Sequence, residues 1–426
     1  MVKVSRRMPK VFVFAIAITY LLEQYISTLI GNNIGGALFI TLVAVLYWVY
    51  SKNAINYKQA LYSTALVALL LSLSLLSYFA VTVNEIGCSF VQKGLTSLLL
   101  IGAVVFGLLL SPDLLSKSIF SDSSTKFILA GAIFALSLAV SGYSIMASMY
   151  SIFRYSDPYI EQSHFALYVC PLIAYRLGVN SRDRIALISM LITSILASSL
   201  TLFIWYGFIF LLLAFEKSFR FFVRILLMLM ILVLIATFTD ISHFTDRIGG
   251  IINFQADVAA SVTNLSSLVW LNGWSQAYES LIQSSMLGLG FNQMGCGNYS
   301  SLGYLSSTLS VGRDTPLNAF DGSFMASKFI SEFGFLGIII VLYITFKSIV
   351  QIKYYLYMSP RVFSKDLPSG SNRNINLPLL SAVCGISMLL QLYVRGFGYF
   401  VFPFILAFAL LNVRDRKLVP IQFESC

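Results

Sequence analysis

Long apolar stretches separated by short polar segments run through almost the whole chain. A helix that crosses a bilayer needs about 20 mostly apolar residues, and fewer where protein covers part of it. The pattern predicts twelve spanning helices, near 11–30, 34–50, 61–81, 94–111, 126–149, 165–179, 185–199, 201–215, 223–240, 324–346, 377–394 and 399–412. The seventh and eighth are the least clearly divided, since only Ser198 and Ser199 interrupt that apolar run. We therefore expect an all-α polytopic membrane protein with about twelve transmembrane helices.

The first apolar stretch follows a basic N-terminus, which is the arrangement of a secretory signal sequence. Residues 11–30 are, however, longer than the apolar region of such a signal, and no small-x-small cleavage site follows them. We therefore expect an uncleaved first span.

Composition agrees with this class of protein. Of the 426 residues, 58% are hydrophobic and 11% charged, whereas a soluble domain carries roughly 25% charged residues. Length and five cysteines exclude a secreted disulfide scaffold, and the apolar content excludes a disordered chain. The placement of the charges excludes a nucleic-acid binder.

The net charge of +10 is explained by topology, because cytoplasmic segments of membrane proteins collect Lys and Arg. An even number of spans places both termini on one side, and we expect that side to be the cytoplasm. Of the 28 basic residues, 22 then lie in or beside inner segments, five lie on the outer side, and Lys328 lies in the tenth span. Those on the outer side are Lys93, Arg154, Arg247, Arg313 and Arg395.

The predicted organisation has three parts. Residues 1–240 hold nine spans and a short polar outer loop at 150–164, residues 241–323 form one large outer loop, and residues 324–426 hold three spans and a cytoplasmic tail. The inner segment 347–376 is expected to be a flexible connector. Apolar residues at helical spacing in the large loop predict an amphipathic helix lying over the membrane face. They are Trp270, Leu271, Trp274, Tyr278, Leu281 and Ile282.

The short outer loop, from Arg154-Tyr155 to His164, holds the strongest cluster of polar groups. Glu161 and His164 are three positions apart at the start of the sixth span, so a helix would place them on one face. One interpretation is structural, because Ser163 can cap a helix and a carboxylate is favoured near a helix N-terminus. That interpretation leaves Arg154 unexplained, since its charge on the outer side opposes the topological bias.

Arg395 is the second candidate, between two apolar spans and directly before Gly396. An arginine at this depth faces either a partner or a cavity, or it extends to the headgroups. Arg247 and Arg313 can bind a ligand or pair with the neighbouring Asp246 and Asp314. The remaining polar candidates, in the tenth span and among the outer cysteines, have structural interpretations.

Lys328 and Glu332, four apart in the tenth span, are expected to pair with each other. Cys88 and Cys296 both lie outside, where a disulfide between them is one alternative. No group of residues has metal-ligand spacing and no phosphate-binding glycine loop is present, so we expect neither a metal nor another cofactor.

Four stretches of the chain together resemble the O-antigen polymerase family (Wzy), which is related to the O-antigen ligases. Gln162 stands where the family more often has proline. The ligases carry a histidine in the large loop close to the following span, and this chain has none there, which favours a polymerase. The four stretches are Arg154-Tyr155 through Glu161-Gln162-Ser163-His164-Phe165-Ala166; Trp274-Ser275-Gln276-Ala277 with Leu287-Gly288-Leu289-Gly290-Phe291-Asn292-Gln293-Met294-Gly295; Asp321-Gly322-Ser323 with Ser331-Glu332-Phe333-Gly334-Phe335-Leu336-Gly337; and Val394-Arg395-Gly396-Phe397-Gly398-Tyr399-Phe400.

The resemblance implies a glycosyltransferase of the bacterial inner membrane, with its active site facing the periplasm. It would move a growing glycan from undecaprenyl pyrophosphate to the non-reducing end of a second carrier-linked repeat, in lipopolysaccharide biosynthesis. Its partners would be undecaprenyl-pyrophosphate-linked oligosaccharides, membrane lipid, and a chain-length regulator and flippase of the same pathway. The alternatives are an O-antigen ligase and a flippase or other transporter of polyprenol-linked glycans.

The chemistry of that reaction assigns roles to the candidate residues. The departing diphosphate gathers negative charge, which arginine engages bidentately. We expect Arg154 and Arg395 to bind it, with further contributions from Arg247, Arg313 and Tyr155. A general base must accept the proton of the attacking hydroxyl. Glu161 is the first candidate, with His164 orienting it or the sugar, or acting as the base instead, and Asp321 is a third.

Overall fold

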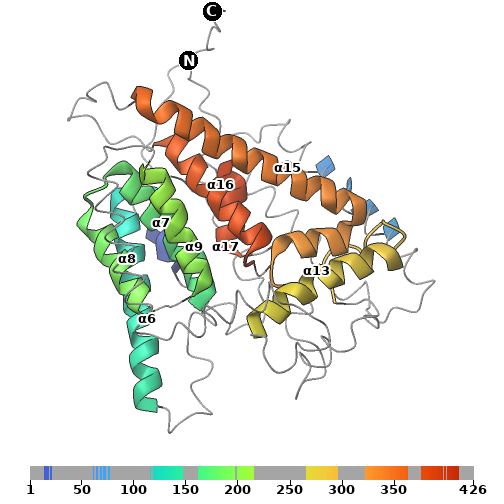
Figure 1. The fold of residues 1–426 in the computed structure, drawn as a ribbon, viewed down its shortest axis with the longest axis horizontal. Coiled ribbons are helices and arrows are strands. Elements are labelled where there is room, and N and C mark those ends of the chain that lie inside the picture. The colour runs from blue at the N-terminus through green and yellow to red at the C-terminus, as the bar shows by residue number, and fades with distance from the viewer. Residues whose placement is uncertain are drawn as a thin grey trace, which may run out of the picture.

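A computed structural model gives the fold for part of the chain, and the chain is helical there. The structure describes residues 14–18, 20–21, 116, 119–146, 162–196, 199–214, 265–295, 322–362, 376–396, 398–399 and 401–411, together with scattered positions from 61 to 76. Within these residues all regular secondary structure is helical (Figure 1). The principal helices are α6 (Asp122–Met146), α7 (Gln162–Val179), α8 (Arg184–Leu196), α9 (Leu200–Ala214), α13 (Leu265–Gln283), α15 (Met325–Val362), α16 (Leu377–Tyr393) and α17 (Phe402–Leu411). The expected all-α class is confirmed for these segments.

Helix boundaries follow the predicted apolar segments closely. The helices expected near 126–149, 165–179, 185–199, 201–215 and 377–394 are α6, α7, α8, α9 and α16. Side-chain oxygens of Asp183, Ser199 and Asn376 cap α8, α9 and α16 by accepting backbone N–H bonds of 3.0, 3.3 and 3.1 Å. The predicted helices at 34–50, 94–111 and 223–240, and most of those at 11–30 and 61–81, lie outside the described residues.

Helix α7 is the central helix of this part of the molecule. Nearly every residue from Phe165 to Leu177 is buried. It packs against α9 on one side and α16 on the other, while α6 and α8 lie further out (Figure 1). An apolar helix buried on all sides is positioned by contacts along its whole length. The two ends of α7 are therefore fixed relative to the rest of the fold.

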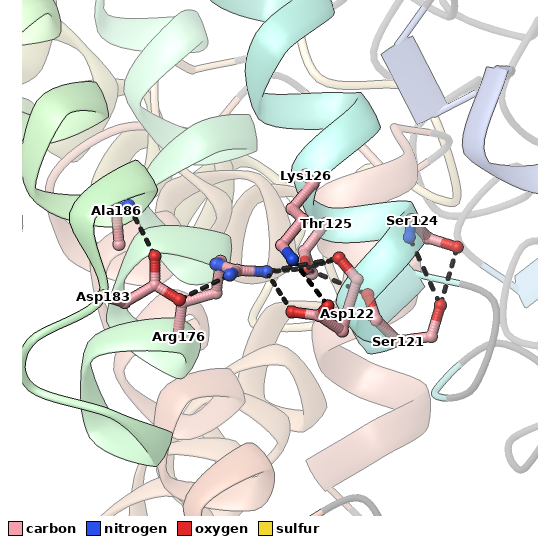
Figure 2. Close-up of polar contacts among 8 residues, drawn as sticks. All are labelled: Ser121, Asp122, Ser124, Thr125, Lys126, Arg176, Asp183 and Ala186. Atoms are coloured by element: carbon pink, nitrogen blue, oxygen red, sulfur yellow. Dashed lines mark hydrogen bonds and ion pairs between the residues drawn. The ribbon is translucent and has the colours of Figure 1, made fainter. Parts of the chain in front are cut away.

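At the C-terminal end of α7, a buried arginine ties three segments together (Figure 2). The Arg176 guanidinium donates to Asp122 Oδ1 at 3.0 Å, to Asp122 O at 3.2 Å and to Thr125 Oγ1 at 2.8 Å, all on α6. It also donates to Asp183 Oδ2, in the turn between α7 and α8. Because Asp183 also caps α8, this network joins α6, α7 and α8 at one end of the bundle.

Helix α15 is longer than the sequence predicted. The expected connector 347–376 is wrong over its first part, because α15 continues to Val362. The physical reason is packing. Ser348 and Tyr355, on the continuation, are buried, and α16 packs against α15 (Figure 1). The continuation therefore gains a buried face that a free connector would lack.

A kink at Gly334, with φ of 57°, divides α15 into two helical parts. The segment after α13 docks into this break. Leu289 N and Gly290 N donate to Ser331 O at 2.8 Å and Glu332 O at 2.9 Å, so carbonyls of the interrupted helix find partners outside it. A Cβ on Gly288, where φ is 85°, would lie 2.4 Å from Glu332 O. The two glycines therefore allow the backbones to meet.

Helix α13 lies along the first part of α15 (Figure 1). The helix predicted from its apolar spacing is confirmed, but its expected apolar stripe is divided between two environments. Trp274 packs on Phe324 with 4.8 Å between ring centroids, and Trp270 Nε1 donates to Tyr393 O at 2.8 Å. Both tryptophans are thus partly buried within the protein. Tyr278 and Ile282, by contrast, are exposed.

One helix among the described residues, Met325–Tyr357 within α15, is long and apolar enough to cross a membrane. Three shorter apolar helices accompany it, at Arg184–Ile195, Thr201–Leu212 and Leu377–Tyr393.

Candidate active site

Arg395 begins the turn that follows α16, and its backbone is held from two sides. Arg395 N donates to Leu390 O at 2.9 Å, which ties the residue to the last turn of α16. Gly396 N donates to Ser323 O at 2.8 Å, directly before α15 begins. A Cβ on Gly396 would lie 2.9 Å from Met325 Cγ. The arginine therefore extends from a turn that is fixed between the end of one helix and the start of another.

The Arg395 guanidinium meets His164 in the first turn of α7. Arg395 Nη2 lies 3.4 Å from His164 Nε2, across 231 positions of sequence. A guanidinium has donors and no acceptor, so Nε2 is the acceptor in this contact. The imidazole proton then resides on Nδ1. The contact thus selects one neutral tautomer of His164.

The protonation state of His164 follows from its position, just before the apolar segment 165–179. Burial, and secondly the positive charge of Arg395, hold the pKa of His164 well below its usual value of 6.5. The side chain is 6% exposed. His164 is accordingly neutral at physiological pH, and its lone pair on Nε2 holds the guanidinium in place.

A tight turn before α15 forms the neighbouring wall of the site. Gly322 and Ser323 both have positive φ, at 65° and 63°. A Cβ on Gly322 would lie 2.4 Å from Met294 Cε, and one on Gly273 of α13 would lie 2.4 Å from Gly322 O. Ser323 is not a glycine, so its left-handed conformation is strained and is held by the surrounding contacts. The turn is pressed between α13 and the segment that follows it.

A buried ion pair supports the same region from within α15. Lys328 Nζ lies 3.2 Å from Glu332 Oε1, which confirms the pairing expected from their spacing. The other oxygen, Glu332 Oε2, accepts from Asn292 N at 2.8 Å and from the Tyr399 hydroxyl at 2.7 Å. Lys328 Nζ also lies 5.3 Å from the centre of the Tyr399 ring. One carboxylate thus links α15, the segment after α13 and the segment before α17.

The arrangement around Arg395 suits an anionic ligand. Helix α7 begins two residues before His164, and α15 begins two residues after Ser323. The N-terminus of a helix carries a partial positive charge and unpaired N–H groups, which attract phosphate. The Arg395 guanidinium contacts His164 at the first of these ends and adds a full charge and a bidentate donor, while the backbone of Gly396 contacts Ser323 at the second.

Two of the site residues expected from sequence, His164 and Arg395, are brought together. The other six expected site residues lie outside the described residues: Arg154, Tyr155, Glu161, Arg247, Arg313 and Asp321. Their roles remain predictions. Cys88 and Cys296, of the possible disulfide, also lie outside them. Among the described side chains, no three His, Cys, Asp or Glu residues lie close enough to hold a metal ion.

Asn292, Ser323 and Tyr399 were missed as parts of this region. Each lies within a stretch that carries the family resemblance, and that was the available signal. Their own residue types gave none, because asparagine and serine are common in turns and a single tyrosine carries no motif. Their contacts join three of the four stretches: Asn292 N and the Tyr399 hydroxyl donate to Glu332, and Ser323 O accepts from Gly396 N.

Comparison of the chain with models of known protein families, with curated proteins and with solved structures finds no match.

Proposed function

We propose that this protein is a multi-pass glycosyltransferase of the bacterial inner membrane that polymerises glycan repeats carried on undecaprenyl pyrophosphate. In this proposal the chain crosses the membrane about twelve times, and the His164–Arg395 cluster faces the periplasm. The resemblance to the O-antigen polymerases supports the reaction. The apolar segments and the distribution of basic residues support the membrane setting.

One observation carries the proposal: each stretch that bears the resemblance contacts another of them. His164 comes from the first stretch and approaches Arg395 of the last at 3.4 Å. Ser323 of the third stretch accepts from Gly396, and Gly288 to Gly290 of the second dock on Ser331 and Glu332 of the third. These contacts link all four stretches, from the first through the fourth and the third to the second.

The proposed reaction forms one bond and breaks another. A hydroxyl at the non-reducing end of the acceptor repeat attacks the anomeric carbon of the donor glycan. The bond from that carbon to the diphosphate oxygen breaks, and undecaprenyl diphosphate leaves with the electron pair. Arg395, together with Arg154, stabilises the charge that collects on the diphosphate. Arg247, Arg313 and Tyr155 are further candidates for binding the substrate.

The proton of the attacking hydroxyl needs an acceptor. Glu161 takes this role in the proposal, with Asp321 as a second candidate. His164 orients the Arg395 guanidinium through its neutral imidazole, and its direct use as the base is the weaker alternative. Replacing Glu161 with glutamine keeps the shape of the side chain and removes the base, so it should impair polymerisation more than His164→Gln.

A deletion strain tests the proposal against its two alternatives. A polymerase mutant should retain a single repeat attached to the lipid core and lose all longer chains. Absence of every surface repeat would instead indicate a flippase, and long chains left on the lipid carrier would indicate a ligase. The extracted glycans, separated by size on a gel, distinguish the three. Restoration of long chains by the wild-type gene, and not by Arg395→Ala, would connect the phenotype to this cluster.

A further inference from the structure

Helix α13 and the turn after it expose four large apolar side chains in a row, Tyr278, Ile282, Met286 and Leu287, called here the α13 ridge. Their exposed fractions are 65%, 61%, 54% and 48%. Tyr278 and Ile282 are four positions apart, so they lie one above the other on one face of the helix. Apart from the exposed Ser285, the side chains most exposed along this edge are apolar.

The buried side of α13 carries many polar groups beside the apolar Leu268, Val269 and Ala277. A helix on a water-exposed surface shows the reverse pattern, with its apolar face inside. Here the buried side chains include a charged one and several hydrogen-bonding ones, all less than 10% exposed. They are Asn272, Gln276, Glu279, Ser280 and Ser284.

Charge is almost absent from this part of the chain. Glu279 is the only charged residue in the whole segment 258–312, and it is buried against the protein. A soluble surface carries roughly one charged residue in four. The outward face of α13 therefore lacks the groups that keep a surface helix in water.

The α13 ridge is continuous with an exposed apolar face on α15. Phe335 N donates to Met286 O at 2.8 Å, which places the two exposed side chains at one junction. Leu342 and Phe346 continue the exposed face along α15. From Phe335 to Lys353, the next exposed charged side chain, the helix rises about 27 Å, close to the ~30 Å hydrocarbon layer of a bilayer. Lys347 lies between them, partly buried, with its ammonium 5.7 Å from the centre of the Tyr343 ring. The ridge then lies where this layer begins.

We propose that the α13 ridge is immersed in the bilayer, at the boundary between the hydrocarbon layer and the headgroups on the side of the His164–Arg395 cluster. The occupant of this surface is lipid acyl chain. The inference rests on the membrane setting of the proposed function and is independent of the polymerase chemistry. It differs from the expected amphipathic helix in which face meets lipid, since Trp270 and Trp274 face the protein.

Fluorescence quenching in liposomes tests this assignment. An environment-sensitive fluorescent amino acid is introduced by codon reassignment at Tyr278, Ile282, Leu342 or Asn180, which leaves the native cysteines in place. All four side chains are exposed, so the replacements open no cavity. The full-length variants are reconstituted in phosphatidylethanolamine and phosphatidylglycerol with lipids brominated in the acyl chains, and iodide is the aqueous quencher.

Positions 278, 282 and 342 should be quenched by the brominated lipid several-fold more than position 180, and by iodide several-fold less. Quenching of 278 and 282 by iodide, with 342 still quenched by lipid, would overturn the ridge and leave the membrane setting intact. Quenching of 342 by iodide would overturn both. A lack of quenching by either agent at 278 and 282 would show protein covering the ridge, which also contradicts the inference.

Discussion

His164 Nε2 lies 3.4 Å from Arg395 Nη2, although 231 positions of sequence separate the two residues. The histidine lies in the first turn of α7, and the arginine lies in the turn after α16. Because a guanidinium only donates, the contact gives the imidazole a positioning role toward Arg395. The predictions below follow from this pair and from the helices that hold it.

Substitutions at the pair should be coupled. Arg395→Lys keeps the charge and loses the planar fork, and His164→Gln weakens its orientation. Each should reduce the rate of polymerisation, and Arg395→Ala should reduce it about 10- to 100-fold, as expected for lost hydrogen bonds between charged groups. In reconstituted protein, the double variant Arg395→Lys with His164→Gln should be less impaired than the product of the two single effects. The exposed Arg182 supplies the matched control, because Arg182→Lys should leave the rate unchanged. Strictly multiplicative effects would mean that the two side chains act separately.

Acid should destabilise the folded protein through His164. The unfolded chain binds a proton at this residue near pH 6.5, whereas the folded chain keeps the imidazole neutral, because burial and Arg395 lower its pKa. The contribution of His164 to the free energy of unfolding is therefore fully present above about pH 6.5 and is lost as the pH drops toward the pKa of His164 in the folded protein. Denaturation midpoints of detergent-solubilised protein at pH 7.5 and 5.5 measure this loss. His164→Gln should show a smaller loss than wild type, and His243 is present in both. An equal loss in the variant would assign the pH dependence to other groups.

The backbone junction at the α15 kink should tolerate no side chain. Gly288→Ala places a Cβ 2.4 Å from both Glu332 O and Gly334 N, at a φ of 85°, and should destabilise the fold by roughly 2–4 kcal/mol. Gly207 in α9 is the matched control, since its added Cβ meets nothing within 4 Å. Gly207→Ala should be neutral or stabilising by up to about 1 kcal/mol. Thermal midpoints in detergent compare the two, and equal midpoints would contradict the close approach.

Loss of the Arg176 network should affect stability and leave the rate per folded molecule unchanged. Arg176→Met removes the bonds to Asp122, Thr125 and Asp183, and the buried arginine makes the change cost about 2–4 kcal/mol. Lys126→Met removes only an exposed pair with Asp122 and should cost less than about 1 kcal/mol. Arg176 lies twelve residues beyond His164, about 18 Å along α7. A large fall in specific activity would show that the network influences the site directly.

The described fold could be predicted where local sequence decides it. Apolar runs with capping residues determine α8 and α16, and the weak break at Ser199 was sufficient to separate α8 from α9. The kink at Gly334 could not be predicted, because the partners of the interrupted carbonyls come from Leu289 and Gly290, some forty positions earlier. The length of α15 was also missed, since its continuation depends on the packing of α16.

The candidate site shows the same division. His164 and Arg395 were recognisable because their polar groups stand out in apolar surroundings. The predicted topology placed both residues on the same side of the membrane, but it could not predict that their side chains touch. Glu332 was expected to pair with Lys328, and it does. The additional bonds to Asn292 N and the Tyr399 hydroxyl depend on two other segments meeting it, which no spacing within α15 encodes.

Polymerisation by the purified protein tests the central claim most directly. Wild-type protein in liposomes, supplied only with undecaprenyl-pyrophosphate-linked repeats, should produce a ladder of longer glycans and release undecaprenyl diphosphate. EDTA should leave this ladder intact, because arginine can neutralise the diphosphate without a metal. Arg395→Ala should form the ladder about 10- to 100-fold more slowly, and Arg182→Lys at the wild-type rate. A full ladder formed at the wild-type rate by well-folded Arg395→Ala protein, or activity that disappears with EDTA and returns with a divalent ion, would contradict the account.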